Sequence, residues 1–154
     1  MIKYPILAID YGDKHFGVAY SDFNGKLASP LPVISITKNR NLTDVITEIL
    51  ETCDEYRIKT ILVGLPQKFK DSQVKTEEKI FHFVSKLEEK TDIPIVTYDE
   101  SFSTINAQNM LTSSGQSTKK SRKKIDSIAA TVFLQEFLNS KQNKIYGEEE
   151  EPNL

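Results

Sequence analysis

An apolar run near the start of the chain, Ile6 to Ile9, ends in the carboxylate of Asp10. A nearly unbroken apolar run inside an extended segment, here Tyr4 to Tyr11, is typical of a strand that is covered on both faces. An ionised carboxylate at the end of such a strand is costly unless a cation or hydrogen bonds stabilise it. This segment therefore predicts a central strand that delivers an acidic group to the edge of a sheet.

The rest of the pattern predicts an α/β fold, with a mixed five-stranded sheet and helices on both faces. We expect further strands at His15–Ser21, Leu27–Thr37, Thr60–Leu65 and Pro94–Tyr98. We expect helices from an Asn41 or Thr43 cap to about Arg57, from about Ser72 to Lys90, and at Thr104–Leu111 and Lys123–Leu138. Three strands followed by strand–helix alternation indicate an antiparallel meander joined by parallel strands. Right-handed crossovers place the later strands beside the first one.

Length and charge suit one domain. We expect the 154 residues to form a domain over 1–142 and an acidic, flexible tail over 143–154. The tail carries Glu148 to Glu151; without these four charges the net charge of −2 becomes +2. No apolar run approaches the roughly 18 residues of a membrane helix, and no signal peptide is recognisable. The single cysteine, Cys53, excludes an intramolecular disulfide and suits the cytoplasm.

Two more carboxylates are expected near Asp10. Glu100 follows the last predicted strand, where alternation places it on the face of Val96 and Tyr98. The carboxyl ends of parallel strands meet at one edge of a sheet, where ligands bind in open α/β folds. Asp126 lies in the first turn of the last helix, beside the apolar stripe Ile125, Ile128, Ala129, Val132 and Phe133.

Three converging carboxylates favour a site for hard cations. Oxygen ligands suit Mg²⁺ or Mn²⁺, whereas the two histidines and one cysteine offer little for zinc. Two such ions about 3.5–4 Å apart activate water and stabilise the leaving oxygen in phosphodiester hydrolysis. Each acid also has an ordinary interpretation: Asp126 as a helix N-terminal acid, Glu100 as a turn acid and Asp10 as a cap of the turn at Gly12.

The chain resembles the YqgF/RuvX family of Holliday-junction-resolvase-like proteins, which are also described as pre-16S rRNA nucleases. The resemblance runs from about Ile6 to Leu138 in four ordered motifs. Residues 7–22, LAIDYGDKHFGVAYSD, are similar to the family's LDYGxKRIGVAxSD, and residues 63–66 read VGLP. Residues 99–104, DESFST, and 125–130, IDSIAA, are similar to DERxTT and DxxAA. The resemblance implies a ribonuclease-H-like fold with Asp10, Glu100 and Asp126 in the acidic positions.

Two family arginines are replaced here, by His15 and Ser101. Neither residue reproduces the bidentate grip of arginine on phosphate. We expect other residues to contact the substrate: Lys14, Lys68, Lys70, Ser103, Thr104 and the basic run Lys119, Lys120, Arg122, Lys123 and Lys124. Contacts of lysine with phosphate add affinity without sequence information.

Several functions are compatible with parts of this pattern. Actin-like kinases share the first motif but close two such domains around a nucleotide, which one domain cannot do. A non-catalytic nucleic-acid-binding module gains nothing from buried acids. A Holliday-junction resolvase would use the same acids but calls for a dimer. We therefore expect a metal-dependent nuclease, monomeric or weakly dimeric, that acts on structured RNA. Processing of pre-16S rRNA ends, with ribosomal precursor particles as partners, is implied by the resemblance alone.

Overall fold

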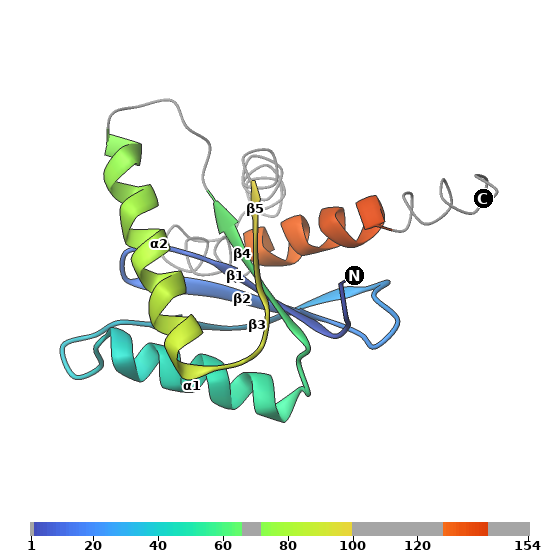
Figure 1. Cartoon of the computed structure of the whole chain (residues 1–154), viewed down its shortest axis with the longest axis horizontal. Coiled ribbons are helices and arrows are strands. Elements are labelled where there is room, and N and C mark those ends of the chain that lie inside the picture. The colour runs from blue at the N-terminus through green and yellow to red at the C-terminus, as the bar shows by residue number, and fades with distance from the viewer. Residues whose placement is uncertain (1, 66–71, 100–127, 142–154) are drawn as a thin grey trace, which may run out of the picture.

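The computed structural model describes residues 2–65, 72–99 and 128–141, with backbone alone at 72–76 and 99. Its strands are β1 (Ile6–Asp10), β2 (His15–Ser21), β3 (Ala28–Ser35), β4 (Thr60–Leu65) and β5 (Ile95–Asp99). Its helices are α1 (Leu42–Glu55), α2 (Ser72–Lys90) and an unlabelled helix at 128–141, drawn in orange in Figure 1.

The five strands form one sheet in the order β3-β2-β1-β4-β5. Strand β1 pairs antiparallel with β2 and parallel with β4, and β4 pairs parallel with β5. The predicted meander, the parallel extension and the central place of the first strand are therefore confirmed. Two prolines, Pro30 and Pro32, lie in β3, where an edge strand tolerates their missing N–H groups.

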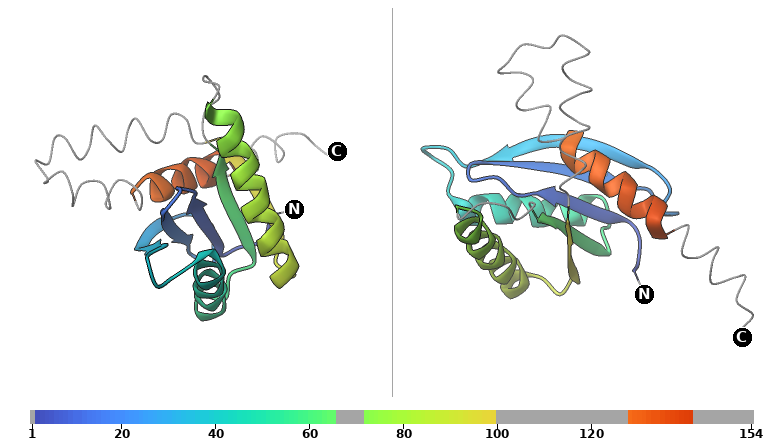
Figure 2. Two further views of the ribbon diagram at one scale, coloured as in Figure 1. Left: turned by 90° about the vertical axis from the view of Figure 1, so that its left-hand side faces the viewer. Right: turned by 90° about the horizontal axis from the view of Figure 1, so that it is seen from above.

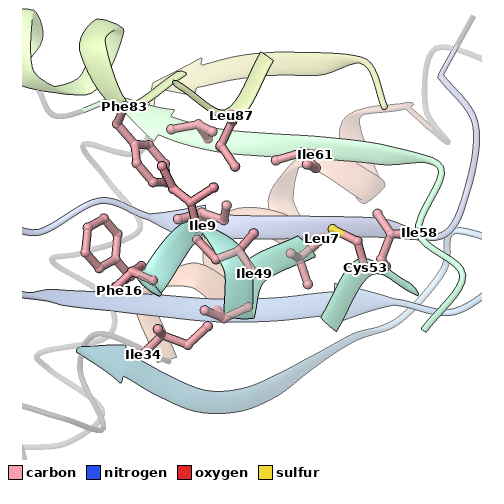
Figure 3. Close-up of a cluster of buried hydrophobic side chains, with 14 of the residues drawn as sticks. Leu7, Ile9, Phe16, Ile34, Ile49, Cys53, Ile58, Ile61, Phe83 and Leu87 are labelled. Carbon is pink, nitrogen blue, oxygen red and sulfur yellow. The ribbon is translucent and has the colours of Figure 1, made fainter. Parts of the chain in front are cut away.

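Strand alternation in β1 supplies two separate apolar clusters. Leu7 and Ile9 pack under α1 and α2 in the cluster shown in Figure 3. Ile6 and Ala8 point to the other face and pack with helix 128–141. Figure 2 shows this helix on the opposite side of the sheet from α1. The sheet is thus covered on both faces, as the apolar run in β1 predicts.

A capping box fixes the start of α1. The Asn41 side chain accepts a hydrogen bond from the backbone N–H of Asp44 at 3.0 Å, and the Asp44 carboxylate accepts one from the N–H of Asn41 at 2.9 Å. Asn41 is therefore the cap, and not the alternative Thr43. The buried stripe of this helix consists of Val45, Ile46, Ile49 and Cys53.

The Gln135 side chain of helix 128–141 forms hydrogen bonds with the β2–β3 hairpin. The Gln135 amide oxygen accepts a hydrogen bond from the N–H of Ala28 at 2.9 Å, and its Nε2 donates to the carbonyl of Lys26 at 2.8 Å. Within the hairpin, Asp22 Oδ1 accepts from the N–H groups of Lys26 and Leu27. These bonds fix the position of the last helix over its face of the sheet.

The last helix differs from its prediction. It continues to residue 141 instead of ending at Leu138. Its buried line is Ala129, Ala130, Phe133, Leu134, Phe137 and Leu138, whereas Val132 is only partly buried. The predicted helix at 104–111, the loop after Pro66 and the tail at 143–154 lie outside the described residues. Within the described ranges, no helix is long and apolar enough to cross a membrane.

Candidate functional site

Asp10 is the last residue of the central strand and is partly buried. Alternation places it on the face of Ile6 and Ala8, which is the face covered by helix 128–141. It is paired in register with Gly17 of β2 and with Gly64 of β4. Since glycine has no side chain, Asp10 is the one side chain in its row across the three central strands.

His15 begins β2 two positions from Gly17, so its side chain lies on the same face as Asp10. Its Nδ1 and the Ser35 Oγ of the edge strand β3 form a hydrogen bond at 2.8 Å. His15 is paired in register with Ser35. This contact orients the imidazole and commits Nδ1 to Ser35.

The turn after Asp10 carries exposed charges. Lys14 is exposed, and its carbonyl accepts a hydrogen bond from the N–H of Ile36 at 2.7 Å. Asp13 Oδ1 and Lys79 Nζ of α2 lie 3.3 Å apart as an exposed ion pair. At Gly12 a Cβ would lie 2.4 Å from the carbonyl oxygen of His15, so only glycine fits. The tight turn thus holds Lys14 at the same sheet edge as Asp10.

The predicted place of Glu100 lies just beyond β5, outside the described residues. The residues before it support the predicted face. Val96 and Tyr98 pack in the cluster under helix 128–141, the same cluster that Ala8 joins. Tyr98 is paired with Gly64, which places it in the row of Asp10. Its ring lies 5.9 Å from that of Phe133, nearly parallel to it.

Asp126 also lies outside the described residues, two positions before the described part of the last helix. The same holds for the predicted substrate contacts Lys68, Lys70, Ser103, Thr104, Lys119, Lys120, Arg122, Lys123 and Lys124. Of the predicted site, the structure therefore describes Asp10 and Lys14. In the described part of the chain, no group of three or more His, Cys, Asp or Glu residues is placed to hold a metal.

The chemistry of Asp10 fits a hard divalent cation. It offers carboxylate oxygens, the donor type that Mg²⁺ and Mn²⁺ prefer. It lies at the carboxyl ends of β1 and β4, the edge where ligands bind in sheets of this kind. Sequence reasoning missed the His15–Ser35 bond, the Asp13–Lys79 pair and the two glycines beside Asp10. All three arise from pairing between distant segments, for which the sequence offered no local signal.

The sequence is similar to those of known proteins over nearly its whole length. The family model RuvX, described as "Holliday junction resolvase", matches residues 4–140. A protein of Thermoanaerobacter pseudethanolicus is 36% identical over 140 residues, which is 90% of this chain and 99% of that protein. One of Desulforamulus reducens is 39% identical over 138 residues, covering 88% of this chain and 96% of that protein. Both are named "Putative pre-16S rRNA nuclease".

Two solved structures share the fold. T. thermophilus RuvC in complex with a Holliday junction substrate aligns with a TM-score of 0.55 at 13% identity, covering 90% of this chain and 96% of that chain. The fowlpox virus resolvase in complex with Holliday junction DNA aligns with a TM-score of 0.50 at 15% identity, covering 90% and 99%. The fold is therefore a RuvC-like ribonuclease H fold.

Proposed function

The chain belongs to the RuvX family, and from this premise we propose that it is a divalent-metal-dependent nuclease that hydrolyses phosphodiester bonds in structured RNA. The observation that carries the proposal is the place of Asp10. It is a partly buried carboxylate at the end of the central strand of a ribonuclease-H-like sheet, between two residues without side chains. We propose the ends of pre-16S rRNA as the substrate, on the names of the relatives.

The proposed metal ligands are Asp10, Glu100 and Asp126. When bound, two divalent ions would supply an activated water and charge neutralisation at the scissile phosphate. Asp10 would hold both ions from the middle of the sheet. Glu100 is two residues beyond Tyr98, so continued alternation would direct it to the face that Tyr98 shares with Asp10.

Support for Asp126 comes from the phase of the last helix. Asp126 precedes Ala130 by four residues and Phe133 by seven, which is the spacing of a single helix face. Ala130 and Phe133 are fully buried against the sheet. A helix continued toward the N-terminus in the same phase would direct Asp126 to the sheet on the face of Asp10.

Substrate contacts are proposed for cations at the same edge. Lys14 is exposed on the turn after β1, where its ammonium group can approach a phosphate without losing its water entirely. Lys68, Lys70, Ser103, Thr104 and the basic run from Lys119 to Lys124 are the remaining proposed contacts. Such contacts make binding salt-dependent, because each neutralised phosphate releases counterions.

A Holliday-junction resolvase is the second candidate, favoured by the description of the family model and by the RuvC-like fold. Resolving a four-way junction symmetrically calls for a dimer, whereas trimming RNA ends does not. We propose a monomer or weak dimer whose nuclease domain spans 1–142, followed by an acidic tail, acting in the cytoplasm on ribosomal precursors. We therefore propose structured RNA, and not the four-way DNA junction, as the substrate.

The test is a cleavage assay with three labelled substrates: structured RNA with 16S-like precursor ends, single-stranded DNA and a four-way DNA junction. Each reaction contains Mg²⁺, Mn²⁺ or EDTA. Asp10→Asn and Asp126→Asn test the site, and Asp13→Asn is the matched control, since Asp13 is an exposed acid three residues from Asp10.

We expect metal-dependent cleavage of the RNA that is lost in both site variants and kept in Asp13→Asn. Preferred cleavage of the junction would select the resolvase. If the folded wild-type protein cleaves none of the substrates but binds them in a salt-sensitive way that Asp10→Asn leaves unchanged, the chain is a binding module and the nuclease proposal is wrong.

A further inference from the structure

Two glycines flank Asp10 in the sheet. Gly17 of β2 and Gly64 of β4 are its register partners, and both are buried. Neighbouring strands lie about 4.8 Å apart, so across the roughly 9.6 Å from β2 to β4 these strands place no side chain other than that of Asp10 in this row. The next row along the same face is different, because Ala8 is flanked there by Ala19 and Leu62, and all three pack in the cluster under helix 128–141.

Backbone conformation does not explain these glycines. Among the described residues, Gly25 is the one glycine with a positive φ, so Gly17 and Gly64 adopt backbone angles open to any L-residue. The pairing of β2 with β3 shifts its register between Phe16 and Val18, a stretch that includes Gly17. The φ angle of Gly17 is nonetheless not left-handed. Glycine inside a strand destabilises it relative to alanine. The identity of both residues therefore points to a need for space on this face.

Within the five described strands, glycine occurs only in the row of Asp10. Cross-strand neighbours place their Cβ atoms about 4.5–5.5 Å apart. A side chain at position 17 or 64 would therefore stand directly beside the Asp10 carboxylate. On the far side of Gly64 the row is closed by Tyr98, whose ring is held against Phe133 and Phe137.

We propose that Gly17 and Gly64 are clearance positions, whose lack of side chains on either flank of the Asp10 carboxylate leaves room for a divalent cation and the phosphate oxygens that share its coordination shell. This inference rests on the proposed function, since it assigns the space to the ligands of that site. The alternative occupant of the space is another part of the protein packed on the sheet. If a cation and its ligands occupy the space, replacing either glycine by alanine should not lower the free energy of unfolding. If another part of the protein packs there, the same replacement should lower it.

The experiment compares Gly17→Ala, Gly64→Ala and the double variant with wild-type protein. Ser29→Thr is the matched control, because it adds one methyl group to a strand of the same sheet at a partly buried position on the other face. Three quantities are measured: the urea midpoint of unfolding, the Kd of Mn²⁺ without nucleic acid, and the rate of RNA cleavage.

We expect the urea midpoints of the glycine variants to stay at the wild-type value or rise, because alanine restricts the unfolded chain. The Kd of Mn²⁺ should rise about tenfold or more in the double variant, the scale of losses caused by altered surroundings of a metal site. Cleavage should fall in parallel, while Ser29→Thr changes neither Mn²⁺ binding nor cleavage.

The contrary result is a fall in the urea midpoints with an unchanged Mn²⁺ Kd, which would show that the glycines make room for protein packing. Unchanged values of all three quantities would equally overturn the clearance role. If wild-type protein binds Mn²⁺ but cleaves no substrate, the proposed function fails while the Mn²⁺ Kd of the variants still decides the role of the glycines. If wild-type protein binds no Mn²⁺, both proposals fail.

Discussion

Replacing Ser21 by alanine is expected to destabilise the protein by removing a buried hydrogen-bond acceptor. Ser21 is 1% exposed, and its Oγ accepts a hydrogen bond at 2.8 Å from the backbone N–H of Ile6, which is fully buried. The same hydroxyl donates to the carbonyl of Asp22 at 3.1 Å. Alanine would leave the Ile6 N–H without this partner at the point where β1 begins.

The expected loss is about 1–3 kcal/mol in the free energy of unfolding, the cost of leaving a buried donor unsatisfied. For a domain of this size the melting temperature would fall by about 2–12 °C, at roughly 2–4 °C for each kcal/mol. Cleavage per folded molecule should be unchanged, because the substitution alters the start of β1 and Asp10 lies at its end.

Urea unfolding followed by far-UV circular dichroism measures the loss, with an unchanged slope as evidence that the unfolded states are comparable. Thr47→Ala is the control. The Thr47 hydroxyl donates to the carbonyl of Thr43 at 3.0 Å at an exposed position, where water replaces it, so a change within about 0.5 kcal/mol is expected. A Ser21→Ala protein as stable as the Thr47→Ala protein would refute the argument.

Three further substitutions or treatments test other contacts. Gln135→Leu removes the bonds to Ala28 and Lys26 and should cost about 1–3 kcal/mol in urea unfolding, with Gln135→Glu costing less because it keeps the acceptor for the Ala28 N–H; equal losses would contradict this. Burial raises the pKa of Cys53 to about 12, so the native thiol should react with iodoacetamide at pH 8 far more slowly than the thiol in urea, and similar rates would show that the site opens readily. Burial raises the pKa of Asp22, but the backbone N–H groups that bond to it outweigh this, and the net pKa is lowered. Its stabilising effect is therefore complete above the unfolded value near 3.9 and is lost as pH falls through the lower folded value. Acid titration of stability should show a smaller loss below pH 4 in Asp22→Ala than in wild-type protein.

Much of the fold could be predicted because its signals are local. The bounds of β2 and β4 agree with the predicted strands, since each combines apolar residues with a clear turn at its ends. The last helix was harder, because apolar residues occupy most of its positions from Ile128 to Leu134. Several faces of this helix could therefore have been the buried one. In the structure the face that packs against the sheet does not include Val132, which is only partly buried.

The site could be predicted only as far as one strand determines it. The position and face of Asp10 follow from alternation within β1. The glycines beside it and the His15–Ser35 bond depend on register between strands, which no single segment encodes. Glu100 and Asp126 remain predictions, supported by the face of Tyr98 and by the phase of the last helix.

The two clusters on either side of β1 differ in when they can be completed during synthesis. The five described strands, α1 and α2 lie before residue 100, and so do all the described members of the cluster under α1 and α2. Half of the described buried residues of the opposite cluster come from helix 128–141. Because a chain emerges from the ribosome N-terminal end first, helix 128–141 reaches the face that carries Asp10 after the described residues of the other cluster have been synthesised. Until then Ile6, Ala8 and Leu62 lack the apolar partners that this helix supplies, which favours binding to chaperones or aggregation.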